Sequence, residues 1–248
     1  MLITRPAGTA TALARRVRAL GGHALLLPGL SLRAAADARA ARSALRAALA
    51  ADVAIFTSPA AVRFAARLLA LRPATRCRVF AVGQGTVRAL HRHGIDGVGA
   101  PAAEAQDSDG LLAHPALARV RGHRVALVGA AGGRDALAPA LRARGATVQR
   151  ADVYQRVAAR LDRRHLDALR RSRGHCYLVL SSGSALANLH AQLPTDAWNK
   201  VLDGMAVVSS ARLAAAARAA GFSRIGVAHS PLGADLLACV AQLHQARA

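Results

Sequence analysis

The sequence is poor in residues that could stack on nucleic-acid bases. Only 3% of its 248 residues are aromatic, although the formal net charge is +21. Proteins that bind single strands combine a basic groove with aromatic side chains, whereas the Arg residues here are spread over most of the predicted helices and form no single stripe. We therefore expect no specific nucleic-acid partner, but a positive field that draws in anionic ligands.

Lysine and glutamate are almost missing as well. Lys200 is the single lysine among 34 basic residues, and Glu104 is the single glutamate among 13 acidic residues. A skew of this kind towards Arg and Ala is typical of coding bias, which accounts for most of the charge. The sequence leaves open whether the field also helps to capture a substrate. A steep salt dependence of the second-order rate constant would indicate capture.

Motifs for metals, disulfides and nucleotide cofactors are missing. Cys77, Cys176 and Cys239 are isolated, which predicts reduced, buried thiols. The segment VGQGTVR has Arg88 where a dinucleotide-binding motif needs its third glycine, and GAAGGR (129–134) lacks the GK[ST] of a P-loop. The sequence thus predicts no metal and no cofactor.

No run of 18 apolar residues exists, so we expect no membrane-spanning helix. The apolar part of the N-terminal segment MLITRPAGTA is too short for a signal peptide, and the segment starts directly with a strand. We expect a cytoplasmic protein without a membrane partner.

One stretch, Val53 to Leu69, shows the strand–turn–helix motif that recurs along the chain. It reads as a buried strand (53–56), two hydroxyl residues, and a helix with Ser58 as N-cap and Pro59 in the first helical position. In an open parallel sheet such a strand end is where ligands bind, and the free N–H groups of the helix favour anions.

The same motif recurs along the chain, since strands alternate with helices throughout. Strands are predicted at 2–4, 24–32, 53–56, 79–83, 95–101, 124–129, 147–156, 176–182, 206–210 and 224–230, and helices at 9–20, 34–49, 59–69, 84–94, 110–117, 135–144, 161–171, 184–193, 211–220 and 234–245. This alternation predicts an α/β fold with parallel sheets covered by helices on both faces. Two similar segments, IFTSPAAVRFAARL and VLSSGSALANLHAQL, lie 124 residues apart and suggest an internal duplication.

Paired hydroxyls end three of the predicted strands: Thr57–Ser58, Ser181–Ser182 and Ser209–Ser210. Each pair alone fits a helix cap, but three at equivalent places predict a shared binding site whose strand-end turns face a cleft. The turn from Gly129 to Arg134 adds backbone N–H groups and a guanidinium that could hold an anion.

No nucleophile or hydrolytic carboxylate pair stands out, since GxSxG is missing and Asp107 and Asp109 fit a helix cap. Tyr154 fits either a buried structural tyrosine or a side chain in a cleft that donates a proton or a hydrogen bond.

At these residues the sequence resembles the uroporphyrinogen-III synthase family. The segments that carry the resemblance are LITRP, IFTSPAAVRF, FAVGQGT, DSDGLL, VALVG, VYQR, LVLSSGSALANL and VVSSARL, which stand in the family's order over essentially the whole chain. One departure concerns Ser209 and Ser210, where relatives often carry Gly and Thr.

The resemblance implies two doubly wound, flavodoxin-like domains joined by a two-stranded linker. Residues 1–32 and 159–248 would form one domain and residues 33–158 the other, with linkers near 28–36 and 150–160. The internal repeat alone would instead suggest tandem halves.

The resemblance also implies a cofactor-free lyase reaction, in which hydroxymethylbilane loses water and closes to uroporphyrinogen III with inversion of ring D through a spirocyclic intermediate. A monomer would receive the bilane from hydroxymethylbilane synthase. Tyr154 would act as an assisting acid or positioning group. The residues expected to bind substrate carboxylates or pyrrole N–H groups are Arg5, Thr57, Ser58, Gly83, Gln84, Thr86, Gly129, Arg134, Ser181, Ser182, Ser209 and Ser210.

Two other functions fit the residues less well. A non-catalytic two-domain module could close on an acidic metabolite, but a sensor of that kind usually accompanies a DNA-binding helix-turn-helix or a signal peptide. A nucleotide-dependent enzyme is disfavoured by the broken glycine motif.

Overall fold

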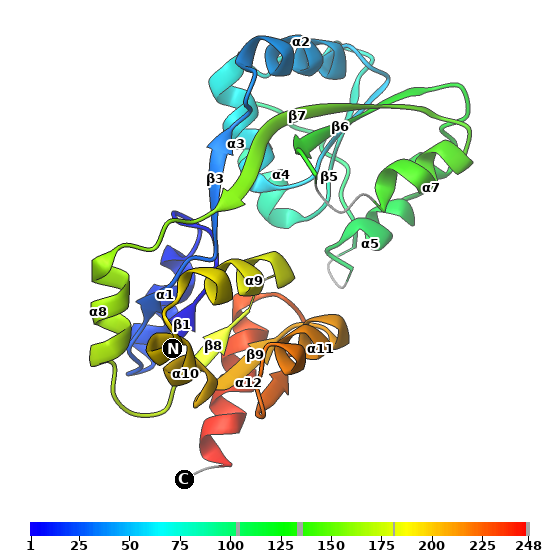
Figure 1. Cartoon of the computed structure of the whole chain (residues 1–248). Coiled ribbons are helices and arrows are strands. Elements are labelled where there is room, and N and C mark those ends of the chain that lie inside the picture. Colours follow the sequence, from blue (N-terminus) through cyan, green and yellow to red (C-terminus); the bar gives the residue numbers. More distant parts are fainter. Residues whose placement is uncertain (103–104, 133–135, 181, 247–248) are drawn as a thin grey trace. The chain divides into compact units, whose positions relative to one another are not determined.

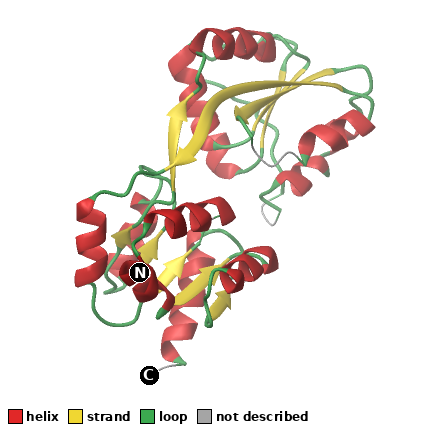
Figure 2. Cartoon of the chain, viewed as in Figure 1, coloured by secondary structure: helices red, strands yellow, loops and turns green. Residues whose placement is uncertain are grey.

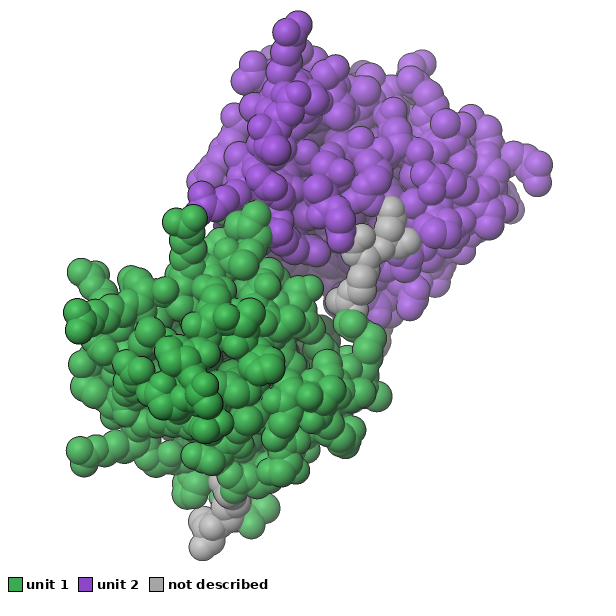
Figure 3. Space-filling model, viewed as in Figure 1, with its two compact units in different colours: residues 1–32, 157–248 green, residues 33–156 purple. Residues whose placement is uncertain are grey.

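The computed structural model describes residues 1–102, 105–132, 136–180 and 182–246. The chain divides into two compact units (Figure 1, Figure 3). Unit 1 consists of Met1–Leu32 and Val157–Ala248, and unit 2 of Arg33–Arg156. Each unit contains a five-stranded sheet with helices between the strands (Figure 2). The predicted fold class, two doubly wound α/β sheets, is confirmed.

The sheet of unit 1 has the order β2-β1-β8-β9-β10, and all its strand pairs are parallel. Its strands are β1 (Leu2–Ile3), β2 (Leu25–Leu26), β8 (Tyr177–Val179), β9 (Met205–Val208) and β10 (Ile225–Val227). Its helices are α1 (Thr11–Ala19), α8 (Arg163–Arg171), α9 (Gly183–Gln192), α10 (Thr195–Leu202), α11 (Ala211–Ala219) and α12 (Gly233–Gln245).

Alternation along the short strands of unit 1 gives the sheet two apolar faces. Leu2, Leu178 and Ala206 pack in one cluster with α8, α9, α10 and α11. Ile3 packs with α1, and Val179 and Val207 pack with α12. Because neighbouring residues of a strand point to opposite faces, a run of consecutive apolar residues can bury both sides of the sheet.

The sheet of unit 2 has the order β3-β7-β6-β4-β5, and β5, β4, β6 and β7 are parallel. Its strands are β3 (Leu30–Ala34), β4 (Val53–Phe56), β5 (Arg78–Ala81), β6 (Arg124–Ala130) and β7 (Thr147–Ala158). Its helices are α2 (Ala38–Leu49), α3 (Pro59–Leu68), α4 (Gln84–His91), α5 (Ser108–Leu112), α6 (Pro115–Ala118) and α7 (Leu137–Ala143). The chain enters unit 2 within β3 and leaves it within β7, and Figure 1 draws these two strands running in opposite directions.

Both sheets share one strand order. In unit 1, the first strand β1 lies between the second, β2, and the third, β8. Among the parallel strands of unit 2, the first strand β4 likewise lies between the second, β5, and the third, β6. Ile3 pairs with Leu26 and Val179, just as Phe56 pairs with Ala81 and Val128. The order is the flavodoxin-like one, and its reversal lies between β1 and β8 in unit 1 and between β4 and β6 in unit 2.

This register corrects the duplication inferred from the sequence. The similarity at 124 residues aligns β4, the first strand of its parallel set, with β8, which is the third strand of the other sheet. The topology instead equates Thr4 with Thr57, each following the central strand of its unit. The repeat therefore reflects the shared strand–turn–helix motif and not equivalent places in two sheets.

Some predicted elements were wrong in detail. Helix α2 begins at Ala38 and not at residue 34, because the Asp37 carboxylate accepts hydrogen bonds from the N–H groups of Arg39 and Ala40 and β3 continues through Ala34. The strand predicted at 95–101 is reduced to one bridge between Phe80 and Gly99. Helix α10 was not predicted, and the side chain of Leu20 is 73% exposed although the pattern placed it on a buried face.

Three further features concern the described residues only. None of their helices is both long and apolar enough to span a bilayer. No cluster of three or more His, Cys, Asp or Glu side chains there could hold a metal ion. All three cysteines are free, with Cys77 and Cys239 buried and Cys176 half-buried.

Gly29 is expected to be intolerant of a side chain. A Cβ atom there would overlap the backbone of Ala185 in α9, and the Gly29 carbonyl accepts a hydrogen bond from Asn188 Nδ2 at 3.1 Å. Gly29→Ala should lower the free energy of unfolding of unit 1 by about 2 kcal/mol, since the helix must move away. Urea denaturation followed by the fluorescence of Trp198, the only tryptophan, measures this.

Gly183→Ala is the matched control, because a Cβ atom at Gly183 meets nothing within 4 Å. It should change the free energy of unfolding by less than about 0.5 kcal/mol. Equal effects of the two substitutions would contradict the close approach of Gly29 to α9.

Candidate functional site

The strand-order reversal of unit 2 opens a cavity at the carboxyl ends of its strands. The chain leaves β4 towards α3 and leaves β6 towards α7, and such a reversal leaves a crevice between the two departing loops. A cavity of about 420 Å³ lies there. Its lining residues are Thr57, Val82, Asp107, Ser108, Asp109, Leu127, Ala130, Ala136, Leu137, Arg150 and Arg156.

Thr57 joins the two central strands at this end. Its hydroxyl donates a hydrogen bond to the carbonyl of Val128, with Oγ1 at 3.2 Å from the oxygen, and its backbone N–H donates to the same carbonyl at 3.0 Å. Gly129 follows, and a Cβ atom built there would stand 2.5 Å from Thr57 Oγ1. Gly129 is thus a glycine because the threonine hydroxyl occupies the space of a side chain.

Ser58 is both a helix cap and part of a hydrogen-bond network. Its Oγ accepts a hydrogen bond from the N–H of Ala61 at 3.0 Å, which confirms the predicted cap of α3. The same Oγ lies 3.2 Å from the hydroxyl of Tyr154. Arg156 Nη2 donates to that tyrosine hydroxyl at 3.4 Å, so the three side chains form one connected set.

Tyr154 is held tightly by its surroundings. Its side chain is 2% exposed, and its ring stacks on that of Phe64 from α3 with centroids 5.3 Å apart. The guanidinium carbon of Arg156 lies 5.9 Å from the centroid of the tyrosine ring. Tyr154 is not among the residues that line the cavity, whereas its hydrogen-bond partner Arg156 is.

Charges of both signs line the cavity. Arg150 Nη2 donates to the carbonyl of Ala130 at 2.9 Å and to Asp152 Oδ1 at 3.0 Å. Asp107 caps α5 by accepting from the N–H of Gly110 at 2.8 Å, as the sequence predicted. The Asp107 carboxylate is partly neutralised by the helix N–H groups, and the Arg150 guanidinium by Asp152, so groups of both signs determine what binds.

The residues predicted near α4 are held mainly by their own chain. The N–H of Gln84 donates to Gln106 Oε1 at 2.6 Å. Thr86 is buried, and its N–H donates to the carbonyl of Gly83 at 2.8 Å. In this structure the first turn of α4 thus has its N–H groups partly satisfied within unit 2.

The predicted site residues of unit 1 lie at the carboxyl end of its own sheet. Ser182 caps α9 and Ser210 caps α11, each by accepting from a backbone N–H, and Ser209 is half-buried beside Ser210. Arg5 Nη2 donates to the carbonyl of Pro231 at 2.8 Å, and burial lowers the pKa of Arg5 from its ordinary value. Arg134 and Ser181, also predicted, lie outside the described residues.

The sequence patterns did not indicate Arg150 and Arg156 as site residues, nor Thr4. Thr4 repeats the role of Thr57, since its hydroxyl donates to the carbonyl of Val179 at 2.8 Å. The shared spacing Thr-x-Pro in LITRP and IFTSP was an available signal. Arg156 ends the segment VYQR, which carries part of the resemblance, but that segment does not mark the arginine as a ligand. Arg150 belongs to no motif, and both arginines lie with Tyr154 on the long strand β7.

A family model described as uroporphyrinogen-III synthase HemD matches residues 11–238. The chain belongs to the uroporphyrinogen-III synthase family. Uroporphyrinogen-III synthase of Salmonella typhimurium is 33% identical over 239 residues, which cover 92% of this chain and 94% of that protein. The Escherichia coli enzyme of the same name is 32% identical over 241 residues, again covering 92% and 94%.

Solved structures of uroporphyrinogen-III synthases share the fold. A mutant of the Thermus thermophilus enzyme aligns with a TM-score of 0.61 at 21% identity, covering 98% of both chains. The Helicobacter pylori enzyme aligns with a TM-score of 0.62 at 15% identity, also covering 98% of both chains. At these identities the likeness concerns the architecture alone.

The packing of Thr57 against Gly129 can be tested by a double-mutant cycle. Gly129→Ala should lower the free energy of unfolding by about 1–2 kcal/mol, because the new methyl group displaces the threonine hydroxyl. In the Thr57→Ala background the same change should cost less, since the obstructing atom is gone. Thermal unfolding followed by circular dichroism measures all four chains, and strictly additive effects would contradict the contact.

Proposed function

We propose that the chain acts at the carboxyl end of the unit 2 sheet, where the cavity and the Ser58–Tyr154–Arg156 set lie side by side. The reaction is that of the uroporphyrinogen-III synthase family: hydroxymethylbilane loses water and closes to uroporphyrinogen III in tetrapyrrole biosynthesis. The observation that carries this function is the family match over residues 11–238.

The reaction requires the protein to impose one conformation on the substrate and to bind its negatively charged groups. The bilane carries acetate and propionate groups on every ring, and it also closes unaided to the uninverted isomer. An enzyme must therefore hold the conformer in which the substituted carbon of ring D reaches the hydroxymethyl carbon of ring A. Correct orientation of reacting groups can contribute about 7–11 kcal/mol to such a step.

Arg150 and Arg156 suit the carboxylates of the bilane. A guanidinium is permanently charged and can donate two parallel hydrogen bonds to a carboxylate. Both side chains line the cavity, and the Thr57 and Ser108 side chains beside them supply hydroxyls. We assign carboxylate binding to Arg150, Arg156 and Ser108 in addition to the predicted residues, which already include Thr57.

Tyr154 serves as a positioning residue in this proposal. The pyrrole nitrogen expels the hydroxyl group of ring A, so the step needs only a weak proton donor. The phenol is 2% exposed and reaches the cavity lining through Arg156. Its hydroxyl fixes the orientation of Ser58 and Arg156, and we prefer this role to direct proton donation.

Five further assignments stay predictions. The two units are expected to be domains linked through β3 and β7, and the protein is expected to be a cytoplasmic monomer that receives the bilane from hydroxymethylbilane synthase. Further substrate contacts are expected from Arg5, Gly83, Gln84, Thr86, Gly129, Arg134, Ser181, Ser182, Ser209 and Ser210.

The function itself is tested by the product isomer. The purified protein is supplied with hydroxymethylbilane generated in the assay mixture, and the uroporphyrin isomers are separated after oxidation. Isomer III should predominate, because the enzyme must outpace spontaneous closure. Formation of isomer I alone, as in a blank without protein, would contradict the assignment.

Tyr154→Phe should slow formation of isomer III about tenfold, which corresponds to the loss of one hydrogen-bonded positioning group of about 1.4 kcal/mol. The stacking on Phe64 is kept, so the thermal unfolding temperature should change little. Tyr177→Phe is the matched control, because Tyr177 lies in unit 1 and its hydroxyl bonds to His244. An unchanged rate in Tyr154→Phe would remove the residue from the site.

A further inference from the structure

A second cavity lies in unit 1, at the end of the strands opposite to the predicted site residues of that unit. It lies at the amino ends of β1, β2 and β8, whereas Arg5, Ser182 and Ser210 follow the carboxyl ends of strands. Its volume is about 690 Å³, within the range of pockets that bind small molecules. The proposed reaction makes no use of it.

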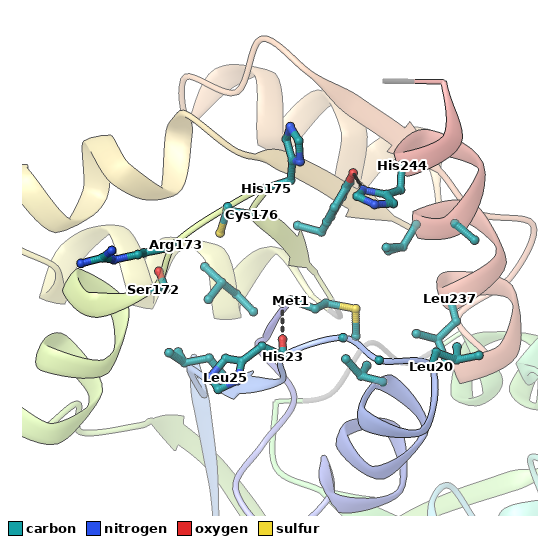
Figure 4. A pocket seen from close by; sticks show the side chains of 18 of the residues that line it. Met1, Leu20, His23, Leu25, Ser172, Arg173, His175, Cys176, Leu237 and His244 are labelled. Atoms are coloured by element: carbon teal, nitrogen blue, oxygen red, sulfur yellow. Dashed lines mark hydrogen bonds between the residues drawn. The ribbon is translucent and has the colours of Figure 1, made fainter. Parts of the chain in front are cut away.

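The walls of this cavity differ in character (Figure 4). One side is apolar and comes from the end of α1 and from α12, with Val17, Leu20, Leu237 and Val240. The other side is the turn between α8 and β8, with Arg171 and Arg173; His175 of the same turn lies against His244 of α12, with ring centroids 5.7 Å apart. Figure 4 shows Leu20 and Leu237 on one side of the space and Ser172 and Arg173 on the other.

Leu20 is an exposed apolar side chain at the rim of the cavity. It is 73% exposed, the highest value among the large apolar residues described as exposed. It follows the last turn of α1, where Val17 is buried, so the apolar face of the helix continues into the opening of the cavity. An exposed leucine beside a hollow is what a bound apolar group would cover.

The charge of the lining is of one sign. Arg171 and Arg173 are its charged side chains, beside the imidazoles of His23, His175 and His244, and none of the described lining residues is an Asp or Glu. This differs from the cavity of unit 2, where two Asp stand with two Arg. Inside, Cys176 is half-buried, and burial raises the pKa of its thiol, as expected in apolar surroundings.

We propose that this cavity binds a small amphipathic carboxylate, with the apolar chain against Leu20 and Leu237 and the carboxylate towards the Arg171–His175 turn. The apolar wall provides affinity through buried area, and the basic turn selects the anion. A neutral molecule with the same apolar chain would lack the contact with the basic turn, and a short carboxylate would lack the contact with the apolar wall.

Cys176 provides the readout, because it lies in the lining and its reaction with N-ethylmaleimide can be followed by peptide mass spectrometry. Octanoate should slow alkylation of Cys176 in a saturable manner, while Cys77 in unit 2 serves as the internal reference. Octan-1-ol and acetate at the same concentrations should protect clearly less. Titration calorimetry of the native protein gives the octanoate affinity independently.

Variants separate this site from unspecific binding to a chain of net charge +21. Arg173→Glu should weaken octanoate binding about fivefold, and Leu20→Glu about tenfold. Arg218→Glu on α11 alters the net charge as much as Arg173→Glu does but lies outside the cavity lining, so it should leave binding unchanged. All three side chains are exposed, so these variants are expected to fold.

Three results would overturn the proposal. The first is no protection of Cys176 and no heat of binding below the micellar concentration of octanoate. The second is equal protection by octan-1-ol, which would remove the role of the basic turn. The third is equal weakening by Arg218→Glu, which would show a general attraction of anions. None of them bears on the synthase activity, which is measured separately.

Discussion

A threonine hydroxyl joins the two central strands of each sheet at their carboxyl ends. Thr57 Oγ1 donates to the Val128 carbonyl at 3.2 Å, and Thr4 Oγ1 donates to the Val179 carbonyl at 2.8 Å. In each case the same carbonyl also accepts a hydrogen bond from the backbone N–H of the threonine, at 3.0 Å for Thr57 and 3.4 Å for Thr4, so the hydroxyl adds a second bond at the strand-order reversal. This second bond ties the two central strands together and, in unit 2, requires glycine at position 129. The cavity, its arginines and the Ser58–Tyr154 contact are arranged around this bond.

Scarce carboxylates shape the rest of the molecule. With 34 basic and 13 acidic residues, most Arg side chains cannot find an ion-pair partner. Several bind backbone carbonyls at the ends of helices instead: Arg42 bonds to Leu68 of α3, and Arg144 bonds to Leu112 of α5 and to Leu117 of α6. These carbonyls have no partner within their helix and lie at the negative end of its dipole, so a guanidinium is a good substitute cap. The excess of Arg is thus partly used by the fold.

Local chemistry made much of this structure predictable from the sequence. Strand β4, the Ser58 cap and Pro59 at the start of α3 follow from residues that touch one another along the chain. The two sheets and the family follow from the alternation of elements and from motifs spread over the whole chain. What escaped prediction depends on contacts between distant strands. Arg150 and Arg156 reach the cavity only because β7 pairs with β6, and the equivalence of Thr4 and Thr57 appears only in the register. Sequence periodicity also cannot tell that the helix carrying Leu13 and Val17 ends before Leu20, which leaves that leucine exposed.

The proposed function requires the carboxyl end of the unit 2 sheet to hold the tetrapyrrole. Hydrogen–deuterium exchange of the native protein, with and without uroporphyrinogen III under reducing conditions, tests it directly. Binding should slow amide exchange in residues 57–62, 82–88 and 105–112, which follow β4 and β5 or line the cavity, and should leave residues 119–123 before β6 unaffected. Slowing at the amino ends of the strands, with none in these three segments, would contradict the account.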